Sequence, residues 1–174
     1  MANVYVNSDV QAGKISSGGT VSGVKSFHAT VAWSVASTDA AGTIYRVFPN
    51  VPSDAIVTSL DIMNGAVTGA SGALIGLYVP SEFGSGIIGS GNQFHTGFDL
   101  SSANAIAGGY VNAMPAVSIL NRDNQLWDLA GQVQYPTSTT GPKAPAYDIC
   151  LTMVNKTTVA TGDICMRLKY IRGV

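Results

Sequence analysis

The sequence predicts an all-β protein: a single-domain antiparallel β-sandwich, jelly-roll-like, with an extended N-terminal arm. Short apolar stretches alternate with turn-forming residues along the chain, and the clearest stretch has the two-residue period of a strand buried on one face. Only one short stretch, at 124–131, favours a helix. A chain of 174 residues can bury one core without needing a metal ion or a disulfide.

The chain is predicted to divide into an arm at 1–25 and a β-sandwich domain at 26–174. Val4, Tyr5 and Val6 are expected to form one short strand, whereas residues 12–23 are rich in Gly and Ser and lack a clear period. An extended arm can add a strand to the exposed edge of another sheet. We therefore expect the arm to contact a partner.

The domain is predicted to contain seven or eight short strands. In the first, at 26–36, alternate residues from Phe27 to Val35 are apolar, and Trp33 is among them. Prolines at 49 and 52 are expected to break the chain, because proline cannot donate to a sheet. Trp33 and Trp127 are expected to be buried. Further strands are predicted at 43–48, 55–63, 73–79, 110–120, 147–154 and 163–171, and loops at 84–97 and 135–145.

Charged residues make up only 11% of the chain, and the net charge is −1. Ordinary soluble proteins have about 25% charged residues. So little charge indicates a surface that is buried in an assembly. The balance predicts no nucleic-acid partner, and the absence of 18 consecutive apolar residues or a signal peptide predicts no membrane partner and synthesis in a cytoplasm.

Motifs that could carry chemistry are isolated. The GxGxxG spelling at 84–89 neither follows a strand nor opens a helix, so it predicts a loop and not a dinucleotide site. His95 lies near Ser90 and Asp99, but no GxSxG elbow accompanies them. The two histidines have no metal-ligand spacing. We expect no enzymatic activity, no metal ion and no cofactor.

Alternate residues of a strand point to opposite faces, and this parity indicates which residues are candidate contacts. His28, Arg167 and Lys169 lie on the faces opposite the apolar residues, which predicts contact with solvent or another subunit. Together with Val4, Tyr5 and Val6, these residues are the candidate assembly contacts. Cys150 and Cys165 have the same outer parity, and a turn between residues 157 and 158 would place them opposite each other as free thiols.

Several segments occur in an order and spacing that resemble a known family. They are AGTIYRVFPNVPSDAIV and GALIGLYVP between residues 41 and 80, QLWDLAG at 125–131, YDICLTM at 147–153 and TGDICMRLKYI at 161–171. The chain resembles the small decoration, or cement, proteins of tailed-phage capsids across roughly residues 41–171.

The resemblance implies a non-enzymatic virion structural protein on the capsid exterior. Its partners would be the major capsid protein and further copies of itself, as a dimer or trimer. An alternative remains open: a tail or fibre-associated module that binds a host glycan. Trp127, which lies between Asp123 and Asp128, and Tyr135 are the candidate sugar contacts in that case, together with the loop at 84–97.

Overall fold

The computed structural model describes residues 3–5, 16–21, 24–80, 83, 86–104, 109–117, 121, 123–131, 144–157 and 161–173. These residues form ten strands and one short helix. In chain order they are β1 (Asn3–Tyr5), β2 (Ser16–Val21), β3 (Val24–Val35), β4 (Ile44–Pro52), β5 (Ile56–Asn64), β6 (Ala73–Tyr78), β7 (His95–Phe98), β8 (Val111–Asn112), α1 (Leu126–Leu129), β9 (Ala146–Thr152) and β10 (Gly162–Gly173).

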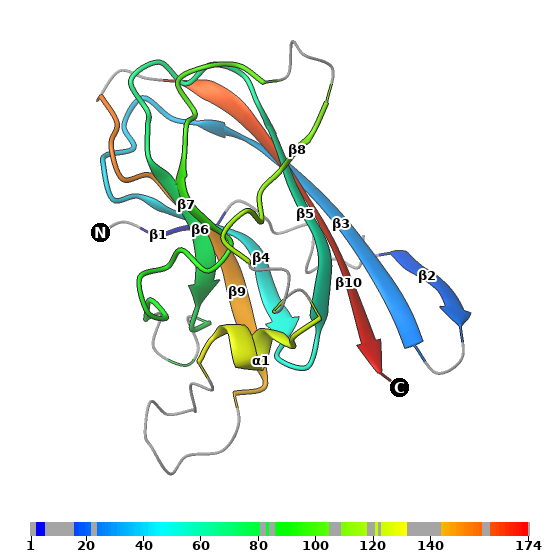
Figure 1. Cartoon of the computed structure of the whole chain (residues 1–174). Helices are drawn as coiled ribbons and strands as arrows, with labels where there is room; N and C mark the ends of the chain where they lie inside the picture. Colours follow the sequence, from blue (N-terminus) through cyan, green and yellow to red (C-terminus); the bar gives the residue numbers. More distant parts are fainter. Residues whose placement is uncertain are drawn as a thin grey trace.

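The strands form two five-stranded sheets that pack as a β-sandwich (Figure 1). Sheet A has the order β1-β4-β9-β6-β7, and sheet B has the order β2-β3-β10-β5-β8. All pairs are antiparallel except β1 with β4, which are parallel. The predicted all-β sandwich is confirmed, whereas the jelly-roll topology is not established by this strand order.

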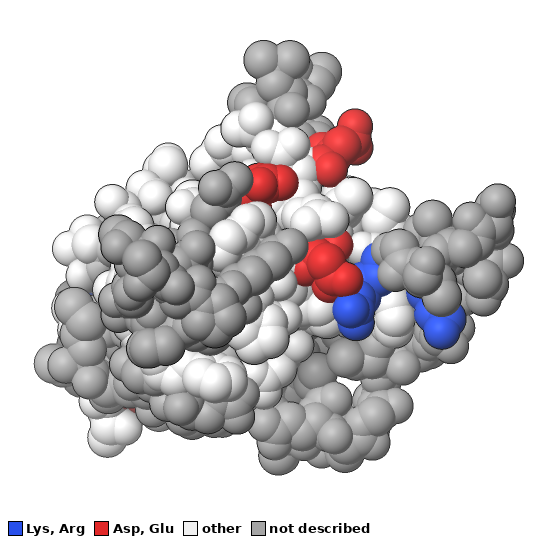
Figure 2. All heavy atoms as spheres, turned by 90° about the horizontal axis from the view of Figure 1, so that it is seen from below, with Lys and Arg blue, Asp and Glu red and all other residues white. Residues whose placement is uncertain are grey.

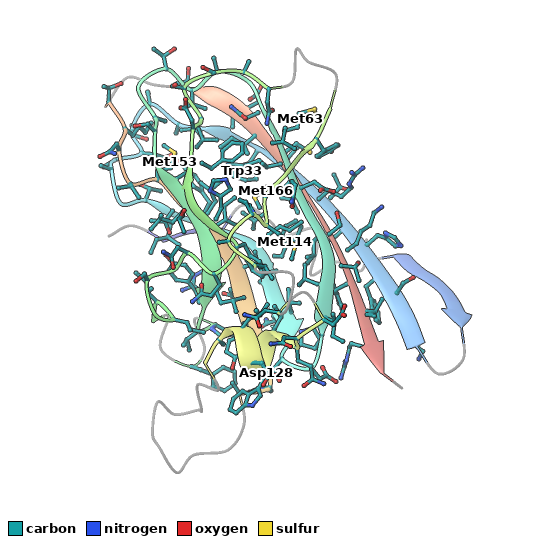
Figure 3. The ribbon with its side chains drawn as sticks, viewed as in Figure 1. Trp33, Met63, Met114, Asp128, Met153 and Met166 are labelled. Carbon is teal, nitrogen blue, oxygen red and sulfur yellow. The ribbon has the colours of Figure 1, made fainter. Side chains whose placement is uncertain are left out.

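The core lies between the sheets, where apolar side chains from alternate positions meet. Ala29, Val31 and Val35 of β3 are buried, as the two-residue period predicts. Trp33 is partly buried, and its ring lies 5.7 Å from that of Tyr45 on the opposite sheet. Figure 3 shows Trp33 between the two sheets. The first predicted strand therefore has the expected inner face.

The helix α1 closes one end of the sandwich near the turn between β4 and β5 (Figure 1). Its backbone is held there because Leu126 N–H donates to the Ala55 carbonyl (2.9 Å) and Trp127 N–H to the Ser53 carbonyl (2.8 Å). Leu126 is fully buried, and Trp127 packs partly buried against the core. The one stretch that favours a helix in the sequence, at 124–131, contains α1.

Three expectations from the sequence are wrong. Pro49 does not end the strand, because β4 continues past it to Pro52 with two register shifts and with Asn50 at a φ of 55°. The segment predicted as a loop at 84–97 contains part of β7 and a fully buried Phe94. Within the described part of 110–120, only Val111 and Asn112 form a strand.

The predicted arm contributes two edge strands in the part that is described. β1 pairs with β4 of sheet A, and β2 pairs with β3 of sheet B. Val6 and most of the other residues between 1 and 23 lie outside the described residues, as do residues 135–143 of the predicted loop at 135–145. The boundary at residue 25 therefore stays a prediction.

Candidate assembly surface

The outward-facing side of sheet A is largely buried. Gly76 of β6 lies so close to residue 91 that a Cβ at Gly76 would overlap the backbone of Gly91. Gln93 fixes this approach, because its side chain accepts a hydrogen bond from Leu77 N–H (2.8 Å) and donates one to the Ile88 carbonyl (2.7 Å). This covering segment removes part of sheet A from any contact with a partner.

A charged pair lies beneath the covered side of sheet A. The Arg46 guanidinium donates to the Asp148 carboxylate, and both side chains are at most 2% exposed. Asp148 also accepts a hydrogen bond from the backbone N–H of Asn50 (2.8 Å), while Arg46 donates to the Val79 carbonyl (3.1 Å). The pair therefore connects β4 and β9 with the end of β6.

The outer face of sheet B, by contrast, is accessible. It consists of alternate residues on three neighbouring strands, and their side chains are small, polar or sulfur-containing. None of these side chains is fully buried. The face is formed by His28, Thr30, Ala32 and Ser34 of β3, by Cys165, Arg167 and Lys169 of β10, and by Ser59, Asp61 and Met63 of β5.

The centre of this face is held in place by one aromatic residue. The Arg167 guanidinium carbon lies 4.2 Å from the centroid of the Tyr110 ring, and Arg167 also donates to the Asp61 carboxylate (3.0 Å). The Tyr110 hydroxyl lies 3.1 Å from the Cys165 sulfur, and this hydrogen bond, with burial, raises the pKa of the Tyr110 phenol. The charge of Arg167 is thus satisfied within the face.

A shallow depression of about 350 Å³ lies next to this centre. It is open to solvent on one side, and its exposed lining is mostly apolar. Figure 3 shows Met63 on the side of β5 that faces away from sheet A. The depression is lined by Ala32, Met63, Asn64, Gly65, Asp163, Ile164 and Cys165.

The structure brings together three of the six candidate contacts. Lys169 lies opposite His28 across β10 and β3, and Arg167 is the next outward-facing residue along β10. Val4 and Tyr5 lie in β1 at the edge of the other sheet, and Val6 is outside the described residues. The alternation along single strands did not identify Tyr110, Asp61 and Met63 as part of this surface. The register of β5 with β10 places Asp61 and Met63 there, and contacts with Arg167 and Cys165 place Tyr110.

The predicted juxtaposition of the two cysteines is wrong. Cys150 lies in β9 of sheet A and is fully buried, whereas Cys165 lies in β10 of sheet B and is partly exposed. The chain passes from one sheet to the other between these strands, so they do not form a hairpin. Both thiols are free, as expected.

Charge is sparse on the surface. The end of the molecule shown in Figure 2 has few charged side chains, and most of its described surface is uncharged. Among the described residues, no three His, Cys, Asp or Glu side chains gather in an arrangement suited to a metal ion. The described part also contains no helix with the length and apolar character needed to cross a membrane.

Comparison with known proteins returns one solved structure. No family model matches the chain, and no curated protein matches it. The chain is similar to a chain of the cyanophage Pam1 capsid asymmetric unit, with a TM-score of 0.36 and 19% sequence identity. The similarity covers 91% of this chain and 93% of that chain.

Proposed function

We propose that this chain is a virion structural protein that binds the exterior of a bacteriophage capsid shell and stabilises it, as a decoration or cement protein does. The observation that carries this proposal is the accessible outer face of sheet B, with its apolar depression and internally paired charge. Such a face can be buried against the major capsid protein without leaving Arg167 unpaired in the contact.

The energetics of such a contact would come mainly from area removed from water. A contact of standard size takes about 800 Å² from each partner, which is roughly a tenth of the 8257 Å² surface of this chain. Buried apolar area contributes roughly 25 cal/mol per Å², although ordering and desolvation reduce the net gain. Because the protein would bind only the assembled shell, mass action would stabilise that shell.

The segments that carry the family resemblance support the same proposal. They form β4, β5, β6, α1, β9 and β10, which are the scaffold of the sandwich. Two of their polar residues, Arg46 and Asp148, make the buried ion pair, and the glycine of the IGLY segment is Gly76. The segments thus include residues that determine the fold, and the one at 161–171 also contains Cys165, Arg167 and Lys169 of the outer face of sheet B.

The proposal is tested by adding the protein to purified phage shells that lack it. We expect the melting temperature of the shells to rise with protein concentration, because binding adds RT ln(1 + [L]/Kd) per site to the free energy that stabilises the shell. This rise should change little with salt. Ala32→Glu places a charge in the depression and should abolish the rise. Ala41→Glu makes the same exchange at an exposed turn and should preserve it.

Three outcomes would contradict the proposal. The first is an unchanged melting temperature of the shells at saturating protein, and the second is equal stabilisation by both glutamate variants. The third is binding of purified host glycans with no change in shell stability, which would favour a tail or fibre module.

A further inference from the structure

The two sheets have four edges, and three of them are short. β1, β7 and β8 have three, four and two residues, whereas β2 has six. An exposed edge presents unpaired N–H and C=O groups, and proteins commonly protect such edges by keeping them short. β2 is the exception in this fold.

The sequence of β2 offers little further protection. Its residues are Ser-Ser-Gly-Gly-Thr-Val. They include neither lysine nor proline, the residues that commonly block further pairing at the edge strands of proteins. Its one irregularity in pairing with β3 lies between Gly18 and Val21, near the turn, so Ser16 to Gly18 pair regularly. Figure 1 shows β2 at the margin of sheet B, on the side away from sheet A. Among the described strands, none lies beyond β2 in sheet B.

We infer that β2 pairs antiparallel with β2 of a second copy of this chain across a two-fold axis, so that sheet B continues through the dimer. A two-fold contact needs only one self-complementary surface, and an uncharged strand is complementary to itself. Among the described residues, the charge nearest to β2 along the chain is Lys25, beside the β2–β3 turn, whereas Lys14, two residues before Ser16, lies outside them. Antiparallel pairing places the two Lys25 residues at opposite ends of the seam, beyond the roughly 10 Å over which exposed charges interact at 0.1 M salt.

The pair is expected to be weak in isolation. Main-chain hydrogen bonds supply the affinity of strand addition, and a seam of six residues spans only about 20 Å. The dimer should therefore form in a concentration-dependent manner without any shell present. This property separates the inference from the proposed function, because the two can fail independently.

Cysteine cross-linking tests the seam directly. Single cysteines are placed at each position from Ser16 to Val21 in a Cys165→Ser chain, in which the remaining Cys150 is fully buried. Residues nearest a two-fold axis meet their own copies. Disulfide dimers should therefore form at one or two adjacent positions at least tenfold faster than at the control positions, and more slowly on either side of them. Thr30→Cys and Thr58→Cys, which are exposed positions within sheet B, are the controls.

A second measurement tests the dimer even if the cysteine variants fail to fold. Light scattering of the unmodified protein should show a shift from monomer to dimer with rising concentration, and Ser17→Pro or Ser16→Pro should remove it. Consecutive residues alternate in the direction of their N–H groups, so one of these prolines blocks the free edge while leaving the pairing with β3 intact. A monomer at roughly 1 mM, a trimer, or β2 cross-linking no faster than the controls would overturn the inference.

Discussion

Removing the negative charge of Asp148 should destabilise the fold strongly. The carboxylate is 2% exposed and is hydrogen-bonded to Arg46, which is completely buried. Burial raises the pKa of Asp148, although the Asn50 N–H and Arg46 act in the opposite direction. Asp148→Asn would remove the negative charge that faces the buried Arg46 guanidinium. Breaking a buried pair in this way costs about 3–5 kcal/mol, a large fraction of a total stability of roughly 5–15 kcal/mol.

A double variant distinguishes the cost of breaking this ion pair from that of lost packing. In Arg46→Met with Asp148→Asn, the methionine fills much of the arginine volume, and the asparagine oxygen can still accept from Asn50 N–H. Replacing a buried pair with neutral groups is often nearly neutral. The double variant should therefore be more stable than Asp148→Asn alone. Arg46→Met alone would leave Asp148 buried without Arg46 and should also destabilise, so purely additive effects would make the double variant less stable than either single variant.

The measurement is urea unfolding followed by tryptophan fluorescence, with the slope of the transition checked for constancy. Asp54→Asn is the matched control, because the Asp54–Arg172 pair is 2.9 Å long but both side chains are more than a third exposed. Exposed pairs contribute about 0–1 kcal/mol. The reasoning is refuted if Asp148→Asn costs no more than Asp54→Asn, or if the double variant is the least stable of the three.

Three further outcomes can be measured on the same protein. Trp33→Ala should lower the free energy of unfolding by about 3–5 kcal/mol, because the ring packs against the core between the sheets; wild-type melting would contradict this packing. Gly76→Ala should cost about 1–3 kcal/mol or more, since the new Cβ overlaps backbone, whereas Gly97→Ala, with open space around it, should cost far less. Burial lowers the pKa of His95 below 6.5, so the unfolded state binds more protons than the folded state. Stability should therefore fall as the pH drops from about 6.5 through the folded pKa. His95→Gln should reduce this pH dependence in urea titrations, and an unchanged pH dependence would contradict its assignment to His95.

The sequence predicted the strands with a clear period and missed the irregular ones. Alternation identified β3 and β10 because each has one face in the core and one outside, so the pattern survives along the strand. The length of β4 was predicted too short. Its two prolines and Asn50, which has a positive φ, interrupt the pattern expected of a strand, so the sequence predicts a break there. β7 and β8 are too short for any period to appear.

The candidate site was less predictable, because parity reports the face of a strand and not what covers that face. Cys150 does point away from the core between the sheets, yet it is fully buried beneath other residues of the chain. Tyr110 reaches Arg167 and Cys165 from a segment 55 residues away from Cys165 in sequence. Contacts of this kind depend on the strand order within a sheet, which local patterns do not determine.

The proposed face and the proposed seam make one combined prediction. Antiparallel pairing of two β2 strands continues sheet B, so the outer faces of the two copies lie on the same side of the joined sheet. A dimer could then engage a shell with both faces at once, and the second contact would form at a high effective concentration. Ser17→Pro or Ser16→Pro, whichever preserves the fold, should therefore weaken shell binding by at least tenfold in co-sedimentation, whereas Ala32→Glu should abolish it. Equal binding by the dimeric protein and the monomeric proline variant would show that the two surfaces act independently.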